Sequence, residues 1–370
     1  MSNSMAGKRL LYVTNDCWWD TDITVLPAVS QEFDLEVFCV SPKNAGERKY
    51  KTKSLPGRVV FHDCKFQRYK GNIGMAIDSI VYGLRVVFAS LGRITIWVPD
   101  NNFWLSTVLV AFMPKKNLIV SLHNYVNHSD SRGWEQKIMD AVIKRFHNFH
   151  FHSPRQWEAF CSDFPYKKSF STVMPVKDFG EPAGAPSLFK NGKKTFLFFG
   201  GIRAYKRPDL FLQVSNRLKG KANFIIAGNG PDWEKVKGMI DPDNPVECMI
   251  RFIENEEIPE LFTSADFLVL PYEDITQSGP LLTAYNYCLP VIASSLPYFE
   301  DMVDNGITGF IFNAGDVDSL EAVVKESIAM TNDDYDKMVI ALRSRVDEYK
   351  QRSDFPGELR SFLNRIQIKV

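Results

Sequence analysis

Glycines and basic residues gather in one short segment in the second half of the chain. The segment Phe199–Pro208 follows a predicted strand and precedes a predicted helix. Gly200 and Gly201 allow a tight turn with an accessible backbone, and Arg203 and Lys206 supply fixed positive charge. Such charge at the carboxyl end of a strand is suited to holding a diphosphate. A solvated basic turn has the same composition, so this segment alone leaves both interpretations open.

Two further loops carry the same kind of chemistry. Ala227–Pro231 is a glycine-rich strand-to-helix loop, which suits a phosphate or nucleoside but also an ordinary turn. In Pro271–Leu282, Ser278 is a candidate helix cap and Pro280 suits the first helical position, so the helix start predicts an anion site or simply a capped helix. The candidate ligand contacts in these two loops are Gly228, Gly230, Glu273, Asp274, Thr276, Gln277, Ser278, Gly279 and Thr283.

The first half offers candidates for the acceptor side. His123 follows the predicted strand Leu118–Leu122 and is placed to hydrogen-bond a sugar hydroxyl, although a single histidine is more often structural. Asp16, Trp18 and Trp19 lie in the predicted first loop. Carboxylates and aromatic rings together suit sugar binding, and tryptophans in a loop also serve as a packing lid.

The chain shows no convincing metal or cofactor motif. His150 and His152 flank Phe151 in a predicted strand, and no nearby carboxylate or cysteine completes a ligand set. The Asp-x-Asp pattern occurs four times, which shows how unspecific it is, and the six cysteines form no Cys-x-x-Cys pair. The first strand is not followed by Gly-x-Gly-x-x-Gly, which disfavours a nicotinamide oxidoreductase. We expect no metal and no resident cofactor.

Composition is that of a globular protein with an uneven charge distribution. Of the 370 residues, 45% are apolar and 24% charged, and the net charge of zero divides into +7 over residues 1–175 and −7 over the remainder. The basic half predicts contact with an anionic membrane surface, whereas overall neutrality disfavours nucleic acid. Scattered cysteines, no visible signal peptide and no apolar run of about 20 residues predict a cytoplasmic protein, peripheral on the inner face of the membrane.

Short apolar runs alternate with amphipathic stretches along both halves, which predicts α/β domains with parallel sheets. Ligands bind such sheets at the carboxyl ends of the strands. We expect a Rossmann-like domain over 1–175, a Pro/Gly-rich linker over 176–194, a second Rossmann-like domain over 195–350 and a helix over 351–370 that packs back on the first domain. Strands are predicted at 10–13, 35–40, 94–98, 118–122, 195–199, 223–227, 250–253, 267–270, 291–293 and 310–312.

Taken together, the second half resembles the retaining glycosyltransferases of the two-domain GT-B fold, especially glycosyltransferase family 4 (group 1). Each matching piece is modest alone, but they occur in the order of the family. They are Phe199–Lys206, Ile226–Pro231, Glu256–Phe262, Ala265–Asp266, Leu270–Tyr272, Thr276–Gly279, Leu289–Ala293 and Asn305–Gly309. The first half matches only through its opening strand and the segment around His123.

The resemblance implies two doubly wound sheets facing across a cleft and a metal-independent, retaining sugar transfer. It implies that Arg203 and Lys206 hold the diphosphate of a UDP- or GDP-sugar, that the backbone of Ser278 and Gly279 contacts the phosphates, and that His123 lies beside the donor sugar. The implied acceptor is a glycan or lipid-linked hydroxyl compound, in bacterial cell-surface glycan synthesis.

The chain departs from the family pattern at two positions. Many members carry two glutamates eight residues apart, and the matching positions here hold Ile275 and Thr283. Glu273 or Asp274 is a candidate substitute for the first glutamate. Two alternatives therefore remain beside the transferase: a non-catalytic sugar-nucleotide-binding protein and a GT-B sugar-nucleotide epimerase.

Overall fold

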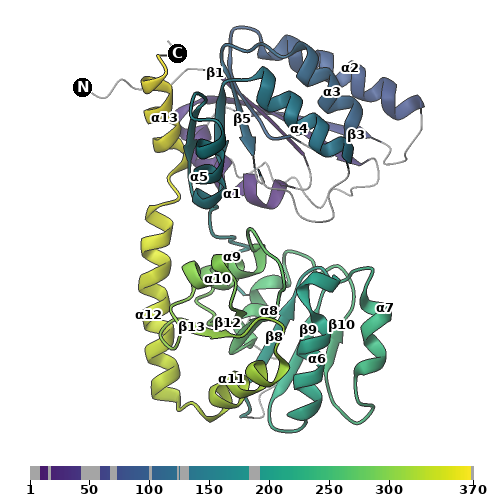
Figure 1. Ribbon diagram of the computed structural model, residues 1–370, viewed down its shortest axis with the longest axis vertical. Coiled ribbons are helices and arrows are strands. Elements are labelled where there is room, and N and C mark those ends of the chain that lie inside the picture. The colour runs from purple at the N-terminus through teal and green to yellow at the C-terminus, as the bar shows by residue number, and fades with distance from the viewer. Residues whose placement is uncertain are drawn as a thin grey trace. The chain divides into compact units, whose positions relative to one another are not determined.

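The computed structural model describes residues 9–15, 18–42, 59–66, 73–99, 102–122, 125, 133–182 and 192–367. The chain divides into two units, drawn in Figure 1. Unit 1 comprises Met1–Pro175 with Arg352–Val370, and unit 2 comprises Val176–Gln351. The chain therefore passes between units twice, after Pro175 and after Gln351.

Unit 1 is built on a seven-stranded parallel sheet in the order β3-β2-β1-β4-β5-β6-β7. The strand order reverses between β1 and β4, which is the topological switch point of this sheet. The strands are β1 (Arg9–Asn15), β2 (Asp34–Pro42), β3 (Val59–Phe66), β4 (Ile94–Trp97), β5 (Leu118–Leu122), β6 (Asn148–Phe151) and β7 (Lys168–Ser171).

Helices cover both faces of this sheet. One face packs against α1 and α13, and the other packs against α2, α3, α4 and α5. On the first face, Phe355, Leu359 and Phe362 of α13 are buried in the core. The helices are α1 (Trp19–Glu32), α2 (Ile73–Ser90), α3 (Phe103–Phe112), α4 (Gly133–Arg145), α5 (Pro154–Asp163) and α13 (Phe355–Arg365).

Unit 2 is built on a six-stranded parallel sheet in the order β10-β9-β8-β11-β12-β13, with its switch point between β8 and β11. The strands are β8 (Thr195–Phe199), β9 (Asn223–Ala227), β10 (Glu247–Met249), β11 (Phe267–Leu270), β12 (Val291–Ser294) and β13 (Gly309–Phe312). The helices are η3 (Ala204–Lys206), α6 (Pro208–Arg217), α7 (Trp233–Val236), η4 (Lys237–Met239), α8 (Ile258–Ser264), α9 (Gly279–Asn286), α10 (Pro297–Met302), α11 (Val317–Ala329) and α12 (Asn332–Gln351).

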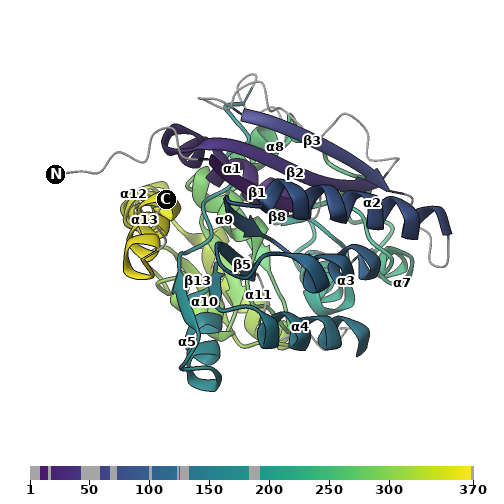
Figure 2. The same cartoon turned by 90° about the horizontal axis from the view of Figure 1, so that it is seen from above.

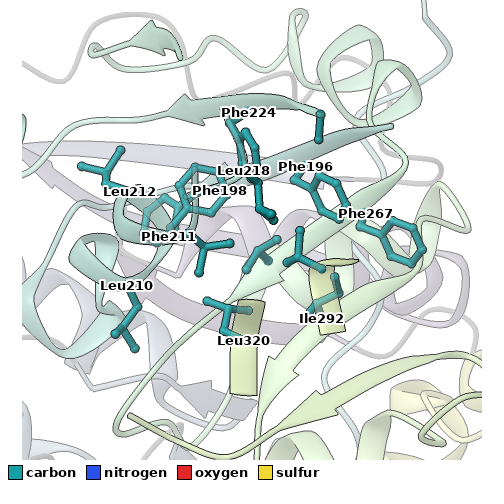
Figure 3. Packing of buried hydrophobic residues seen from close by; sticks show 14 of the residues in the cluster. Phe196, Phe198, Leu210, Phe211, Leu212, Leu218, Phe224, Phe267, Ile292 and Leu320 are labelled. Carbon is teal, nitrogen blue, oxygen red and sulfur yellow. The ribbon is translucent and has the colours of Figure 1, made fainter. Parts of the chain in front are cut away.

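Phenylalanines dominate the core beneath the sheet of unit 2 (Figure 3). Phe196 stacks on Phe224 with ring centroids 5.6 Å apart, and on Phe267 with centroids 5.7 Å apart. These three rings come from the adjacent strands β9, β8 and β11. Their stacking holds the central strands in register, and the loops that follow those strands are positioned by it.

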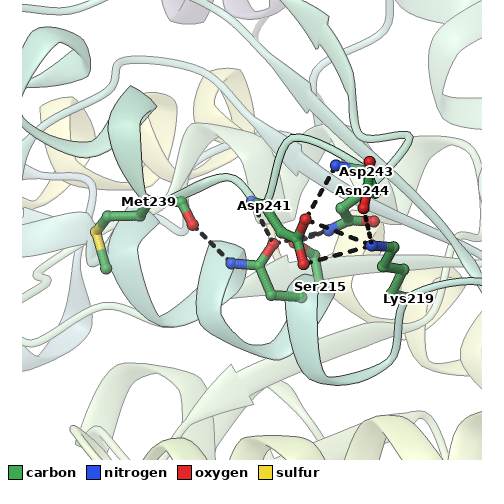
Figure 4. Close-up of polar contacts among 7 residues, drawn as sticks. Ser215, Lys219, Met239, Asp241, Asp243 and Asn244 are labelled. Atoms are coloured by element: carbon green, nitrogen blue, oxygen red, sulfur yellow. Dashed lines mark hydrogen bonds and ion pairs between the residues drawn. The ribbon is translucent and has the colours of Figure 1, made fainter.

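A polar network holds the segment before β10 on α6 (Figure 4). Asn244 donates from Nδ2 to Ser215 Oγ at 3.1 Å, and Lys219 pairs with Asp241 at 3.4 Å. The N–H of Asp243 donates to Asp241 at 2.9 Å, and these contacts lower the pKa of the Asp241 carboxyl. One of the Asp-x-Asp pairs noted in the sequence is thus occupied by structural contacts.

The structure differs from the sequence expectations at several elements. An edge strand was expected at 250–253, but β10 lies at Glu247–Met249. The sequence did not indicate it because Glu247 and Cys248 are exposed, so the strand contains no apolar run. Helix α1 replaces part of the loop expected after β1, and it continues through Pro27. Unit 2 begins at Val176, so the first residues of the expected linker belong to it. None of the helices that the structure describes is long and apolar enough to cross a bilayer.

Candidate functional site

The predicted ligand loops of unit 2 leave the sheet at the same edge. β8 pairs with β9 on one side and with β11 on the other. The loops that start at Gly200, Gly228 and Pro271 therefore emerge side by side at the carboxyl ends of three adjacent strands. The β8 and β11 loops flank the switch point, which is where open parallel sheets bind ligands.

Backbone contact joins the first two loops. The N–H of Gly200 donates to Ala227 O at 2.8 Å, and the N–H of Ile202 donates to Asn229 O at 2.9 Å. A Cβ on Gly228 would lie 1.9 Å from Gly200 O, and a Cβ on Gly230 would lie 2.0 Å from Ile202 O. Gly228 also has a φ of +138°. These glycines are required because the two loops touch through their backbones.

Lys206 is the half-buried cation of the site. A Cβ built on Gly200 would lie 3.5 Å from Lys206 Nζ and 3.5 Å from Pro280 Cγ, so the ammonium lies beside the start of α9. The ammonium also lies 5.1 Å from the centroid of the Tyr272 ring. Burial and, to a smaller extent, the charge of Arg203 lower the pKa of Lys206 to about 8. No carboxylate within the described residues pairs with Lys206, so an anion would stabilise its charged form.

Two arginines in the same loop have different surroundings. Arg203 is exposed and precedes η3. Arg207 donates from Nε to Asp209 at 2.9 Å and also pairs with Glu273, which holds the guanidinium in place. Glu273 therefore already has a cationic partner, and its N–H donates to Tyr205 O at 2.7 Å. The predicted contact between the Glu273 carboxylate and a bound sugar nucleotide would compete with that ion pair.

Ser278 and Gly279 begin α9 as the sequence predicted. The buried Ser278 accepts a hydrogen bond from Leu281 N–H at 3.2 Å through its hydroxyl, and one from Leu282 N–H at 3.1 Å through its carbonyl. Pro280 has no N–H. Within the described residues the N–H of Gly279 donates to no acceptor, so it is available to an anion at the positive end of the helix dipole.

The remaining predicted contacts in this loop differ in availability. The Nε2 of Gln277 is buried with no hydrogen-bond partner among the described residues, which is costly unless a ligand accepts from it. Thr283 is buried, and its hydroxyl donates to Gly279 O at 3.0 Å. Asp274 is exposed and Thr276 is half-buried. Gln277 thus offers the clearest free donor after Gly279.

Lys177 is a basic residue that the sequence interpretation placed in a linker. A Cβ on Gly279 would lie 3.4 Å from Lys177 Nζ, so this ammonium also lies at the start of α9. The N–H of Lys177 donates to Leu282 O at 3.3 Å, Asn286 donates to Asp178 at 3.1 Å, and the Tyr287 hydroxyl donates to Gly180 O at 3.0 Å. Only these tertiary contacts identify the position of Lys177.

At the corresponding place in unit 1, the carboxyl end of β1 is occupied by a side chain of α1. The buried Asp22 of α1 accepts hydrogen bonds from Thr14 and, at 2.7 Å, from Tyr12. Burial raises the pKa of Tyr12, and the charge of Asp22 adds to this. Trp19 is only 1% exposed and packs in the core, whereas Trp18 is half-buried against that core. This corrects the acceptor-side prediction for Trp19, because a buried ring cannot stack on an acceptor sugar.

The other predictions in unit 1 are less directly addressed. His123 and Asp16 lie outside the described residues. His150 lies between Ser121, 2.8 Å from Nδ1, and Thr172, 2.9 Å from Nε2, and His152 is buried beside it. Burial lowers the pKa of His152 to about 4. Among the described residues no group of His, Cys, Asp or Glu side chains is arranged to hold a metal ion.

Comparison with known proteins supports the assignment of the second half. Residues 193–329 match the family described as glycosyl transferases group 1. The chain is 22% identical over 181 residues to a GDP-mannose:glycolipid 4-beta-D-mannosyltransferase of Xanthomonas campestris pv. campestris, which covers 48% of this chain and 49% of that protein. The chain thus spans about half the length of this relative.

Solved structures resemble the whole chain in fold. Sucrose-phosphate synthase of Thermosynechococcus elongatus superposes with a TM-score of 0.74 at 12% identity, covering 96% of this chain and 100% of that one. Anabaena Alr3699/HepE in complex with UDP and glucose superposes with a TM-score of 0.71 at 13% identity, covering 97% and 99%. At such identities the likeness shows the fold alone.

Proposed function

Since residues 193–329 match the family described as glycosyl transferases group 1 and both units carry doubly wound parallel sheets, we propose that this protein transfers a sugar from a nucleotide diphosphate donor to a hydroxyl acceptor. The donor diphosphate binds at the switch point of unit 2. Lys206, Arg203, the N–H of Gly279 and the amide of Gln277 are its contacts. Lys177 adds a second ammonium at the start of α9.

The observation that carries this proposal is the position of Lys206. Its ammonium is half-buried, has a lowered pKa, and lies beside both Gly200 and the start of α9. Holding a cation in such a place is unfavourable unless it is needed, since desolvation opposes its charge. A diphosphate supplies the missing negative charge and accepts a hydrogen bond from the N–H of Gly279.

The same groups would assist the departure of the leaving group. In the proposed reaction the bond from the anomeric carbon to the donor phosphate breaks, and the acceptor oxygen forms a new bond to that carbon. The departing diphosphate carries the negative charge and takes the proton of the acceptor hydroxyl. Lys206, Arg203 and the start of α9 stabilise that charge, each contact contributing about 3 kcal/mol. The family resemblance implies retention at the anomeric carbon and no metal requirement.

The donor and acceptor classes are proposed from resemblance. The Anabaena neighbour is described with UDP and glucose, and the Xanthomonas relative is named for GDP-mannose and a glycolipid. We therefore propose a UDP- or GDP-sugar as donor and a glycan or lipid-linked acceptor in bacterial cell-surface glycan synthesis. His123 is proposed to lie beside the donor sugar, as the resemblance implies.

A panel of UDP- and GDP-sugars, tested for thermal stabilisation and then for transfer to acceptor extracts, tests this function. We expect Lys206→Ala and Arg203→Ala each to reduce transfer at least about a hundredfold while the protein stays folded. Lys219→Ala, which removes an ammonium paired with Asp241, is the matched control and should leave transfer unchanged. Near-normal turnover in both loop variants would remove these residues from the mechanism.

The absence of glutamates at Ile275 and Thr283 favours a second candidate, a non-catalytic sugar-nucleotide-binding protein. Stabilisation by a sugar nucleotide without transfer to any acceptor would support it. Conversion of the donor sugar without an acceptor would instead indicate an epimerase. For a transferase, the anomeric configuration of the product, measured by NMR, decides between retention and inversion.

A further inference from the structure

Basic residues precede three adjacent strands of unit 1. Lys115–Lys116 lies just before β5, Lys144–Arg145 shortly before β6, and Lys167–Lys168 at the start of β7. These strands are neighbours in the sheet, in the order β5-β6-β7. Because they run parallel, their amino ends share one edge of the sheet, opposite to the carboxyl edge at which such sheets bind ligands. The three pairs therefore gather positive charge at the amino edge.

A pocket of about 670 Å³ lies at this edge, and we call it the amino-edge pocket. Its volume is in the range of small-molecule sites, about 300–1,000 Å³. Lys115, Lys116 and Lys168 line it together with His147, and its described lining contains no acidic residue. The remaining lining residues are Asn117, Asn148, Tyr166, Ile366 and Gln367. A concave surface whose charges have one sign concentrates ions of the opposite sign, so this pocket favours anions.

Helix ends give a structural reason for cations at this edge, but other basic residues already satisfy it. The helices α3, α4 and α5 each connect two parallel strands, so their C-terminal ends, with partial negative charge, lie at the amino edge. Figure 2 shows α3 and α4 side by side, and Arg145 donates to Met113 O at the end of α3 at 3.0 Å. Lys167 donates from Nζ to Phe146 O, just beyond α4, at 2.7 Å. The lysines that line the pocket are therefore not needed at these two helix ends.

The lysines of the pocket gather without a negative partner. Lys115, Lys116 and Lys168 are exposed, and none of them pairs with a carboxylate among the described residues. Holding like charges close together is unfavourable, and an anionic ligand would relieve their repulsion. Ammonium groups bind phosphoryl oxygens through charge-assisted hydrogen bonds. Three positive charges exceed the charge of one phosphate monoester, about −1.5 to −2 at pH 7, and are better matched by two phosphoryl groups.

We infer that the amino-edge pocket binds a small soluble compound with two phosphoryl groups, held by Lys115, Lys116 and Lys168. The site belongs to unit 1 and lies at the amino ends of its strands, whereas the proposed diphosphate contacts of the donor belong to unit 2. The inference therefore does not depend on the proposed transferase activity, and each of the two anion sites can fail without the other.

Lysine footprinting of the unchanged full chain tests this inference, with inorganic pyrophosphate as the probe. Acetylation of each lysine is measured by mass spectrometry with and without pyrophosphate, at low ionic strength because salt screens exposed charges. We expect pyrophosphate to slow the acetylation of Lys115, Lys116 and Lys168 at least about fivefold. Lys221, an exposed lysine of unit 2, should react at an unchanged rate. Protection of Lys206 without protection of the three pocket lysines would overturn the inference and leave the donor site standing.

Titration calorimetry with pyrophosphate measures the affinity of the same site in a Lys206→Ala protein, which lacks a cation of the donor site. Adding Lys115→Gln/Lys168→Gln should weaken binding at least about tenfold. Adding Lys221→Gln/Lys325→Gln instead removes the same charge from the surface of unit 2 and should leave affinity unchanged. All four lysines are exposed, so both proteins should stay folded, which circular dichroism verifies. Equal affinity in the two, or equally tight binding of glycerol 3-phosphate with its single phosphoryl group, would overturn the inference.

Discussion

The two sheets have the same strand order at their centres, yet their switch points are built differently. In unit 2 the loops after β8 and β11 hold glycines, a half-buried ammonium and a free helix-start N–H. In unit 1 the carboxyl end of β1 meets Asp22, which accepts hydrogen bonds from Tyr12 and Thr14. Topology alone thus supplies a place for a ligand, and the side chains decide whether that place is open to an anion or filled.

The largest effect that would test this contrast comes from the glycine loops. Gly228→Ala should destabilise the protein by about 3 kcal/mol and impair nucleotide binding, because the new Cβ would meet Gly200 O at 1.9 Å. Gly238→Ala is the control, since a Cβ there meets nothing within 4 Å. Urea unfolding measures both. A Gly228→Ala variant as stable as Gly238→Ala would show that the loops do not depend on backbone contact.

A smaller change in stability is expected at the switch point of unit 1. Tyr12→Phe removes a 2.7 Å hydrogen bond to the buried Asp22 carboxylate and should cost about 2 kcal/mol. Tyr335→Phe, which removes a 2.9 Å hydrogen bond to the neutral carbonyl of Asp266, should cost about 1 kcal/mol. Nucleotide affinity should be unchanged in Tyr12→Phe. Reduced affinity measured by calorimetry would mean that the unit 1 switch point takes part in donor binding.

The pH dependence of nucleotide binding tests the role of Lys206 at the switch point of unit 2. The pKa of Lys206 is about 8 without ligand, and a bound diphosphate favours the protonated form. As the pH rises through 8, binding must recapture a proton, so affinity for UDP or GDP should fall by up to about tenfold per pH unit. Lys206→Met should remove this fall. Titration calorimetry between pH 7 and 9.5 measures the affinity of both proteins. If affinity falls equally with pH in both, Lys206 is not responsible.

The smallest predicted effect concerns Lys177. Lys177→Ala should weaken UDP or GDP binding about fivefold, because one of two ammonium groups beside the start of α9 is lost. Lys177→Arg should restore part of the affinity, and Lys193→Ala serves as a control in the same chain segment. If Lys206→Ala weakens binding and Lys177→Ala does not, the anion site excludes Lys177. If neither nucleotide binds the unchanged protein, the donor site itself is refuted.

Sequence patterns predicted those strands whose residues are buried on both sides. β8, β9 and β11 were placed with their observed bounds, because uninterrupted apolar runs between polar loops leave little ambiguity. β10 was misplaced because Glu247 and Cys248 are exposed at a sheet edge. α1 was missed because Pro27 and the aspartates near its start disfavour a helix locally. Packing of its apolar side chains in the core outweighs that local preference.

The candidate site was predicted in part for a similar physical reason. Lys206 and Ser278 precede or begin helices next to buried strands, so the strand order brings them together. Lys177 is placed by hydrogen bonds from its segment to α9, and no local pattern encodes those. Trp19 was assigned to a loop, and only the formation of α1 turns its ring into the core. Tertiary contacts thus determine where residues such as Lys177 and Trp19 lie, which sequence periodicity does not predict.

The return of α13 to unit 1 has a consequence for how the protein is made. Phe355, Leu359 and Phe362 complete the core beside α1, and Arg360 pairs with Glu32. On the ribosome, residues 176–351 emerge before this helix, so unit 2 can fold as one continuous stretch while unit 1 still lacks one of the two helices that cover that face of its sheet. Synthesis order therefore lets unit 2 complete its core first, whereas the core of unit 1 is completed only when α13 has emerged.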